Sequence, residues 1–469
     1  MTRKFLLVVF FLLVYRSGFS QNLTDHAQPT SDPSQKYNGV GGGIGASIFK
    51  GKPFLLLNGA SQYEAWQTLG IGLDGYVRIG QDGKFRKEDF DDWYDALRWI
   101  NYIRLGHPGE NLYARLGGMN NVTLGHGTIV DNYSNNSSYD DRKVGIVGRI
   151  DMGLFGFEGF SSDVLVTKSV LAGRGFVRPF QAAPLLGKLW FFKNFEIGGT
   201  ASYDFDSNAV RIIPNHAPWV QKIYHIYGGD KPRDSTIVLT DSTKAASPLT
   251  VYGVDATLMV WQSDRLEGRI YGDLVDIVHF NNGHVVGARA SFLVDSTTFV
   301  DLRIERYVFK NHFLPNYYNS FYERERFAGD ITNSAYISKA TRLSDTASGQ
   351  GNGFKLGSFF DFGGKVQVGV TYAHLDNLRN ADLMNISLTF PNIWWKFYGA
   401  FNYTRGAIDG SKDFFGFDEN TVASTRLSFQ PFRFLTLNLL ARWTFYQGDD
   451  NRVHTQSIIE PKAVFIARF

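Results

Sequence analysis

Apolar and polar residues alternate along many short segments of the chain, and residues 434–447 show the pattern best. Side chains of a β-strand point alternately to its two faces, so this alternation predicts a strand whose faces meet two different environments. The first face is apolar and without charge, and comprises Leu435, Leu437, Leu439, Ala441, Trp443 and Phe445. The second comprises Thr436, Asn438, Arg442, Thr444 and Tyr446, with Leu440 as the exception.

The same pattern recurs through the second half of the chain. Turn residues such as Pro431, Pro391-Asn392 and Gly363-Gly364 separate the segments. The strands predicted there, from the C-terminus backwards, are 457–469, 434–447, 421–430, 393–405, 382–390, 365–374, 353–362, 298–309, 284–294, 266–279 and 249–262.

The first half of the chain is less regular. Residues 112–130 form one long strand or two strands broken at Met119-Asn120, and residues 39–48 are a glycine-rich stretch without a clear assignment. The other strands predicted there are 193–205, 169–180, 153–160, 142–151, 69–80 and 54–63. The total is about 18 strands, with 16 to 20 acceptable, and single-chain bacterial barrels normally have an even number.

One segment departs from the strand pattern. Across residues 84–104, Phe90, Trp93, Leu97 and Ile100 follow helical spacing, while acidic residues cover the other side. We therefore expect a short amphipathic helix, at the periplasmic end by the strand count. Two interpretations stay open: a helix packed on the barrel rim, or one folded into the lumen.

The connections between the predicted strands mostly alternate between short and long, as an up-and-down barrel requires. Short turns of bacterial barrels lie on the periplasmic side and long loops face outward. We therefore expect two long outer loops, at about 206–248 and 310–352.

The start of the chain is typical of a secretory signal peptide. Arg3 and Lys4 precede an apolar run, and small residues follow at Gly18 and Ser20. The run is shorter than the roughly 20 apolar residues of a membrane-spanning helix. The predicted organisation is a signal peptide at 1–20, a lead-in at 21–52, and a barrel at 53–469.

Composition narrows the function classes. The chain has no cysteine, which excludes thiol nucleophiles, disulfides and cysteine metal sites. A formal net charge of +3 gives no reason to expect a nucleic-acid partner. Aromatic residues at 15% and 49 glycines suit the aromatic girdles and close strand packing of a membrane barrel.

The chain closes on Val464-Phe465-Ile466-Ala467-Arg468-Phe469. Its terminal aromatic residue resembles the signal by which barrel-assembly machinery recognises outer-membrane proteins of Gram-negative bacteria, with Phe465 and Phe469 as its aromatic residues. The usual pattern has an aromatic residue where Ala467 stands here. The chain thus resembles a Gram-negative, porin-like outer-membrane β-barrel protein of no particular family. The resemblance implies a transmembrane antiparallel up-and-down barrel in the outer membrane, in contact with lipid.

If the apolar faces meet lipid, the opposite faces line the lumen. On the four central strands these faces carry charges of both signs, which either tie strands together as acid–base ladders or form a binding site for a polar solute. The residues predicted to line the lumen are Asp255, Glu267, Arg269, Asp273, Arg289, Asp301, Arg303 and Glu305.

Catalytic and cofactor chemistry find little support. His126 lies between two glycines, but Asp131 at i+5 would point to the opposite face of a strand, and no serine has a nucleophile-elbow setting. The glycine run at 41–45 lacks the lysine and hydroxyl residue of a phosphate loop. No histidine pair has a helical metal-binding spacing. We therefore expect no catalytic residues, no metal and no cofactor.

The expected function is passage or binding of small polar solutes, as a porin-like channel or a diffusion transporter. Two alternatives are a structural or assembly anchor for a periplasmic or surface partner, and an outer-membrane enzyme that modifies lipid. The sequence does not identify the solute, the oligomeric state, or whether the pore is open.

Overall fold

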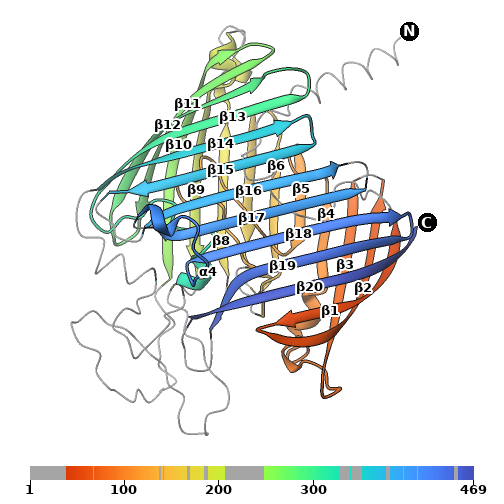
Figure 1. Cartoon of the computed structure of the whole chain (residues 1–469). Coiled ribbons are helices and arrows are strands. Elements are labelled where there is room, and N and C mark those ends of the chain that lie inside the picture. Colours follow the sequence, from red (N-terminus) through yellow and green to blue (C-terminus); the bar gives the residue numbers. More distant parts are fainter. Residues whose placement is uncertain are drawn as a thin grey trace, which may run out of the picture.

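The protein folds as a closed antiparallel β-barrel in which each strand pairs with its neighbours in the sequence (Figure 1). The structure is a computed structural model. It describes residues 38–468 except 67, 137–138, 141, 166–168, 184–188, 206, 208–247, 327–338, 340–350, 377–380, 394–395, 409 and 448–452.

The described residues form 20 strands. The first ten are β1 (Gly39–Phe49), β2 (Lys52–Ala65), β3 (Leu69–Gly80), β4 (Ile100–Leu105), β5 (Leu112–Gly117), β6 (Gly145–Asp151), β7 (Phe155–Ser161), β8 (Val170–Val177), β9 (Glu196–Asp204) and β10 (Leu249–Gln262). The second ten are β11 (Leu266–Ile277), β12 (Asn282–Leu293), β13 (Thr298–Phe309), β14 (Gly351–Phe362), β15 (Val366–Leu375), β16 (Asp382–Ile393), β17 (Phe397–Ile408), β18 (Thr421–Phe432), β19 (Leu435–Gln447) and β20 (Val453–Arg468).

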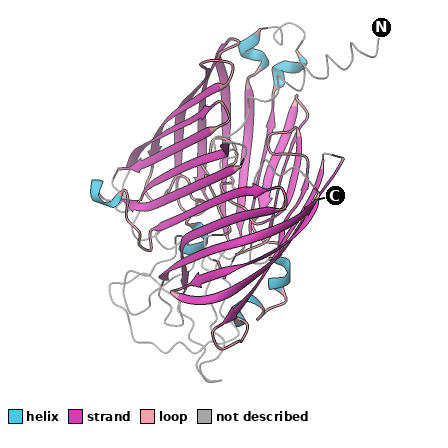
Figure 2. Cartoon of the chain, turned by 45° about the vertical axis from the view of Figure 1, so that its right-hand side comes forward, coloured by secondary structure: helices cyan, strands magenta, loops and turns pink. Residues whose placement is uncertain are grey.

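The helices are single turns in the connections between strands (Figure 2). They are η2 (Lys87–Asp89), α2 (Tyr94–Leu97), η4 (Pro179–Ala182), α3 (Trp190–Lys193), α4 (Tyr322–Glu325) and η6 (Ser411–Asp413). Among the described residues, no helix is both long enough and apolar enough to cross a bilayer.

The two ends of the barrel differ in their connections. We call the end with the connections β2–β3, β4–β5, β10–β11, β12–β13 and β14–β15 the turn end, where β1 also begins and β20 ends. The opposite end, which carries the connections β5–β6, β9–β10 and β13–β14, is the loop end. These two ends confirm the expected up-and-down order of the strands.

The outer face of the barrel is apolar. Val286, Leu302 and Ile304, which alternate with buried or half-buried inward residues, are between 41% and 62% exposed. Solvent-exposed rows of large aliphatic side chains are unfavourable in water, and they match the lipid-facing band of a transmembrane barrel. The closed barrel with this belt places the protein in an outer membrane, as the sequence predicted.

The observed strand number lies within the predicted range, and two strands were missed. The glycine-rich stretch treated as part of a lead-in is β1, so the barrel begins at Gly39 rather than at residue 53. The second missed strand is β4, at the end of the segment expected to be helical. Residues 1–37, which contain the predicted signal peptide, lie outside the described residues, as do most of the two predicted outer loops and Phe469.

The helix expected over residues 84–104 is not one element. The segment contains η2 and α2 as single turns, and Ile100 then starts β4 by pairing with Leu73. It lies at the loop end, not at the periplasmic end that the sequence predicted. Phe90 and Trp93 are exposed there, whereas Tyr94 is buried. Helical spacing failed as a guide because residues 100–105 pair with both β3 and β5, and the closed ladder of the barrel requires a strand at this place.

The barrel closes where β1 pairs with β20. The pairing runs from Gly39 opposite Arg468 to Gly45 opposite Lys462, and it resumes at Ile48 opposite Ile459. A Cβ atom on Gly45 would lie 2.2 Å from the carbonyl oxygen of Pro461, whereas one on Gly42 would meet nothing within 4 Å. The two strands can therefore approach this closely only if position 45 has no side chain.

We expect Gly45→Val to impair closure of the barrel and Gly42→Val to be tolerated. The valine at position 45 would overlap backbone atoms of β20, and such overpacking costs about 1–3 kcal/mol or more. Refolding yield and heat-modifiable migration on a denaturing gel measure closure. Equal yields of the two variants would contradict this account of the seam.

Candidate solute pathway

The connection between β5 and β6 runs into the lumen instead of forming a loop outside it. We call residues 118–144 the inner segment. It begins where β5 ends at Gly117, whose φ of 145° lies in a region that other residues rarely adopt. Val122 and Tyr133 pair as an isolated antiparallel bridge, so the segment forms a hairpin-like fold of its own. The strand or strand pair predicted over residues 112–130 thus stops at Gly117.

The apolar side chains of the inner segment pack against one side of the barrel wall. They form the largest hydrophobic cluster among the described residues, together with wall residues of β7, β8 and β10–β13. From the inner segment this cluster contains Met119, Val122, Leu124, Ile129, Val130 and Tyr133. This side of the lumen is therefore filled, and burial of apolar area holds the segment there.

His126 fixes the inner segment to β10 and β11. Its Nδ1 lies 2.7 Å from Oδ1 of Asp273, and its Nε2 lies 2.8 Å from Oγ1 of Thr257. The imidazole also stacks on the ring of Tyr271 at a centroid distance of 4.0 Å. The hydroxyl of Thr128 donates a second hydrogen bond to Asp273. The glycine-flanked histidine thus attaches the inner segment to the barrel wall.

Other polar contacts reach the wall further along the barrel. Lys355 of β14 donates to Asp131 at 2.7 Å, and both side chains are at most 5% exposed. Asn132 donates to Asn385 of β16 at 2.6 Å. The inner segment is therefore fastened to wall strands from β10 to β16.

A second connection supports the inner segment from the loop end. The backbone amide of Tyr318, between β13 and β14, donates to the carbonyl of Ile129, and the amide of Asp131 donates to the carbonyl of Tyr318. Glu323 of α4 accepts hydrogen bonds from Lys143, at 2.6 Å, and from Tyr133. Burial alone would raise the pKa of Glu323, but the cations of Lys143 and Arg326 outweigh it and lower that pKa to about 2.

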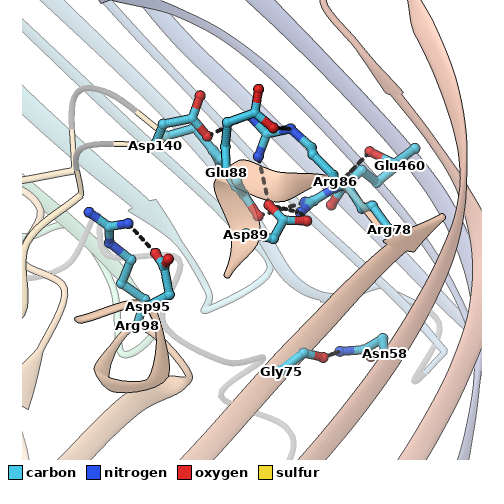
Figure 3. A network of polar contacts seen from close by, with 12 residues as sticks. Asn58, Gly75, Arg78, Arg86, Glu88, Asp89, Asp95, Arg98, Asp140 and Glu460 are labelled. Atoms are coloured by element: carbon cyan, nitrogen blue, oxygen red, sulfur yellow. Dashed lines mark hydrogen bonds and ion pairs between the residues drawn. The ribbon is translucent and has the colours of Figure 1, made fainter. Parts of the chain in front are cut away.

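A buried arginine, Arg78, lies between Asp89 and Glu460 at the seam of the barrel (Figure 3). Arg78 of β3 is 1% exposed, and its guanidinium contacts Glu460 of β20 at 2.6 Å and Asp89 of η2 at 3.0 Å. It also donates to the hydroxyl of Tyr139, in the inner segment, at 2.6 Å. One side chain thus joins β3, β20, η2 and the inner segment.

All eight residues predicted to line the lumen lie at the alternate positions of β10–β13 whose side chains point into the barrel. All eight are engaged in contacts within the wall or with the inner segment. Asp273 holds His126, and the ion pairs are Arg174–Asp255, Arg269–Glu267, Arg289–Asp301 and Arg303–Glu305. These pairs match the interpretation as acid–base ladders, and a role of the eight residues in contacting solute stays a prediction.

Three adjoining cavities lie on the other side of the lumen. The central cavity has a volume of about 260 Å³ and lies between the inner segment and strands β3–β5 and β17–β20. The turn-end cavity, of about 180 Å³, shares Asp74, Asn101, Arg426 and Leu440 with it. The side cavity, of about 60 Å³, shares Asn121, Asn402 and Thr404 with it. The three cavities therefore adjoin one another between the turn end and the inner segment.

The residues of the central cavity were mostly missed from the sequence. Of the eight predicted residues, only Arg303 lines any of these three cavities. Alternation alone would have found Arg426, because it points to the same inner face of β18 as Ser424 and Ser428. Arg142 was predicted to start the strand 142–151, but β6 begins only at Gly145, so Arg142 belongs to the inner segment and strand alternation does not indicate its direction.

One group of side chains has the composition of a metal site. Ligand atoms of His126, Asp255 and Asp273 lie within 4.8 Å of one another. However, the guanidinium of Arg174 contacts Asp255 at 2.9 Å, and a cation at this place disfavours a metal ion. Thr257, His126 and Asp273 also have the distances of a nucleophile–base–acid series, but the adjoining cavity is only about 10 Å³. A substrate would have no room there.

The chain matches no protein-family model, and no curated protein sequence matches it. Solved structures with a similar arrangement include Wzi of Escherichia coli, an outer-membrane, carbohydrate-binding β-barrel involved in group 1 capsule assembly. It is 11% identical, with a TM-score of 0.33 over 92% of this chain and 84% of that chain. The outer-membrane protein OprD of Pseudomonas aeruginosa is 7% identical, with a TM-score of 0.30 over 94% and 98%. A loop-deletion mutant of OmpT, an outer-membrane protein of Vibrio cholerae, is 8% identical, with a TM-score of 0.29 over 91% and 98%.

We expect Asp131→Asn to loosen the inner segment while the barrel stays closed. The substitution leaves the buried ammonium of Lys355 without its carboxylate, and such a loss costs about 3–5 kcal/mol. Limited proteolysis, followed by mass spectrometry, should show cleavage within residues 118–144. The double variant Asp131→Asn/Lys355→Met removes both charges and should recover protease resistance. If Asp131→Asn is as resistant as the wild type, the contact does not fasten the segment.

We expect the contact between Glu323 and the inner segment to weaken in acid. The pKa of Glu323 is lowered from 4.5 to about 2, so its stabilising contribution is complete above pH 4.5 and is lost as the pH falls towards 2. Hydrogen exchange of the amides around Tyr133 and Val144 should accelerate over that range. The variant Glu323→Gln should lack this part of the pH dependence, and an unchanged profile would contradict the assignment.

Proposed function

We propose that this outer-membrane barrel passes small polar solutes along the side of the lumen that the inner segment leaves open. The observation that carries the proposal is the series of three adjoining cavities. They share lining residues, they extend from the turn end to the inner segment, and each has polar side chains in its wall. A solute could therefore stay in contact with polar groups along most of this path.

The inner segment acts as a constriction in this proposal. It is fastened to the wall by buried apolar contacts and by ion pairs, and such a segment narrows a pore without needing to move. We call the side of the lumen that contains the three cavities the hollow side. The inner segment borders it with Asn121, Ser134 and Asn136, which offer hydrogen bonds to a passing solute. By the usual orientation of bacterial barrels, the turn end faces the periplasm.

The proposal includes no catalytic step. His126, the residue with the most suggestive sequence context, serves the attachment of the inner segment, and its neighbours Thr257 and Asp273 are both at most 7% exposed. The proposal also requires no cofactor.

Replacing residues 120–136 with a short glycine–serine linker should raise single-channel conductance severalfold in a planar bilayer. The linker removes most of the constriction, whereas the seam and the strand ladder stay intact. A matched control shortens the β17–β18 connection at residues 411–415, at the same end of the barrel, and should leave conductance unchanged. A correctly folded wild-type barrel that never conducts would overturn the channel proposal in favour of an anchoring role.

A further inference from the structure

The central cavity is strongly basic. Six of its lining side chains are cationic and two are acidic, and the turn-end cavity adds Lys462. The six cations come from the connection between β3 and β4, from β5, from the inner segment, and from β18 and β19, so residues far apart in the sequence contribute to one positive surface. They are Arg98, Arg115, Arg142, Lys143, Arg426 and Arg442.

The two acidic residues at the cavity are already held by other groups. Glu460 accepts from Arg78 at 2.6 Å and from Ser47 at 2.9 Å. Asp74 accepts from the amide of Asn58 at 2.6 Å and from the hydroxyl of Tyr76. These carboxylates therefore do little to neutralise the arginines that face the cavity.

Two of the arginines have no carboxylate within ion-pair distance in the part of the chain that the structure describes. Arg442 of β19 lines the cavity without an ion pair of its own. Arg142 donates to the carbonyl of Tyr139 at 2.7 Å and lies over the same residue's ring, with 4.3 Å between Cζ and the centroid. A guanidinium in such a setting retains donors for an incoming anion, and its planar fork suits carboxylate and phosphate oxygens.

Charge is distributed differently on the filled side of the lumen. There the acidic residues Asp255, Asp301 and Glu305 each contact an arginine, and each is at most 7% exposed. On the hollow side, Arg98 and Lys143 are paired with Asp95 and Glu323. Positive charge that has no acidic partner among the described residues is therefore left on the hollow side at Arg142 and Arg442. An anion that enters this space meets a favourable potential along the path.

The uncharged lining adds a second requirement. Amides of Asn101 and Asn402 and hydroxyls of Ser424 and Thr404 offer hydrogen bonds. Amides and hydroxyls suit a solute that carries hydroxyl groups on a compact ring or chain. The basic residues suit an anionic group on the same solute.

We propose that the central cavity is a binding site for small hydroxylated anions, in which Arg142 and Arg442 hold the anionic group and the amides hold the hydroxyl groups. The proposal names the solute class of the proposed channel and rests on that function for its biological role. The anionic group is a carboxylate or a phosphate, since both offer oxygens to a guanidinium.

Ion selectivity is the first test. The reversal potential of the refolded wild type in a KCl gradient should show preference for chloride over potassium. Arg442→Gln should reduce the permeability ratio about twofold or more. Lys412→Gln removes the same charge from an exposed position that lines none of these cavities, and it should leave the ratio unchanged. A conducting wild type without anion preference would overturn the inference and leave the channel proposal standing.

Binding is the second test, and it does not depend on conductance. Calorimetry on the folded barrel in detergent should show glucuronate and glucose 1-phosphate binding about tenfold more tightly than glucose, and the tighter of the two anions identifies the anionic group. Arg442→Gln and Arg142→Gln should each remove this advantage, whereas Lys412→Gln should keep it. Circular dichroism and heat-modifiable migration verify that each variant is folded.

The two tests separate the proposals. A barrel that binds these anions through Arg442 but does not conduct would support the binding site and overturn the channel. Equal binding of glucuronate, glucose 1-phosphate and glucose, or binding that survives both arginine substitutions, would overturn the binding site.

Discussion

Closure of the backbone hydrogen-bond ladder is the constraint on which the rest of the structure depends. No water in the bilayer core can satisfy an amide or carbonyl, so a strand with an open edge is not tolerated there. The ladder closes where β1 meets β20, and the glycines of β1 allow that approach at Gly45. Arg78 then ties this seam to β3 and to the inner segment through Glu460 and Tyr139. The seam and the lumen are therefore parts of one network rather than independent features.

A closed barrel of this size encloses more space than its wall side chains fill, and the chain fills that space on one side only. The inner segment buries its apolar residues against β7, β8 and β10–β13, while Asn121, Ser134 and Asn136 line the cavity towards β17–β20 and β3–β5. Acidic and basic side chains are also distributed unequally between the filled and the hollow side of the lumen. Acidic residues lie mainly in ion pairs on the filled side, and cations predominate around the central cavity. Packing of one connection thus generates both the constriction and the positive potential beside it.

The attachments of the inner segment differ in physical character. Apolar packing is insensitive to pH, whereas Glu323 stabilises the segment only while it is ionised. Buried pairs such as Lys355–Asp131 fix the position of the segment more than they stabilise it, since desolvation offsets most of the attraction within such a pair. The segment is therefore specified by several independent contacts to different strands. This arrangement suits an element that must hold a cavity of defined shape.

The sequence by itself determined the architecture, because alternation between two faces is a local property that can be recognised in each strand separately. Residues such as Val286, Leu302 and Ile304 indicated the lipid face correctly. The missed strands β1 and β4 have weak local patterns, and their strand state comes from pairing with β2, β20, β3 and β5. Alternation also gave the inward parity of Asp273 and Arg303, but not which side of the lumen is filled. Only the tertiary structure decided that, because the fold of the inner segment and its contacts with strands distant in the sequence place Arg142 beside Arg442 and His126 beside Asp273.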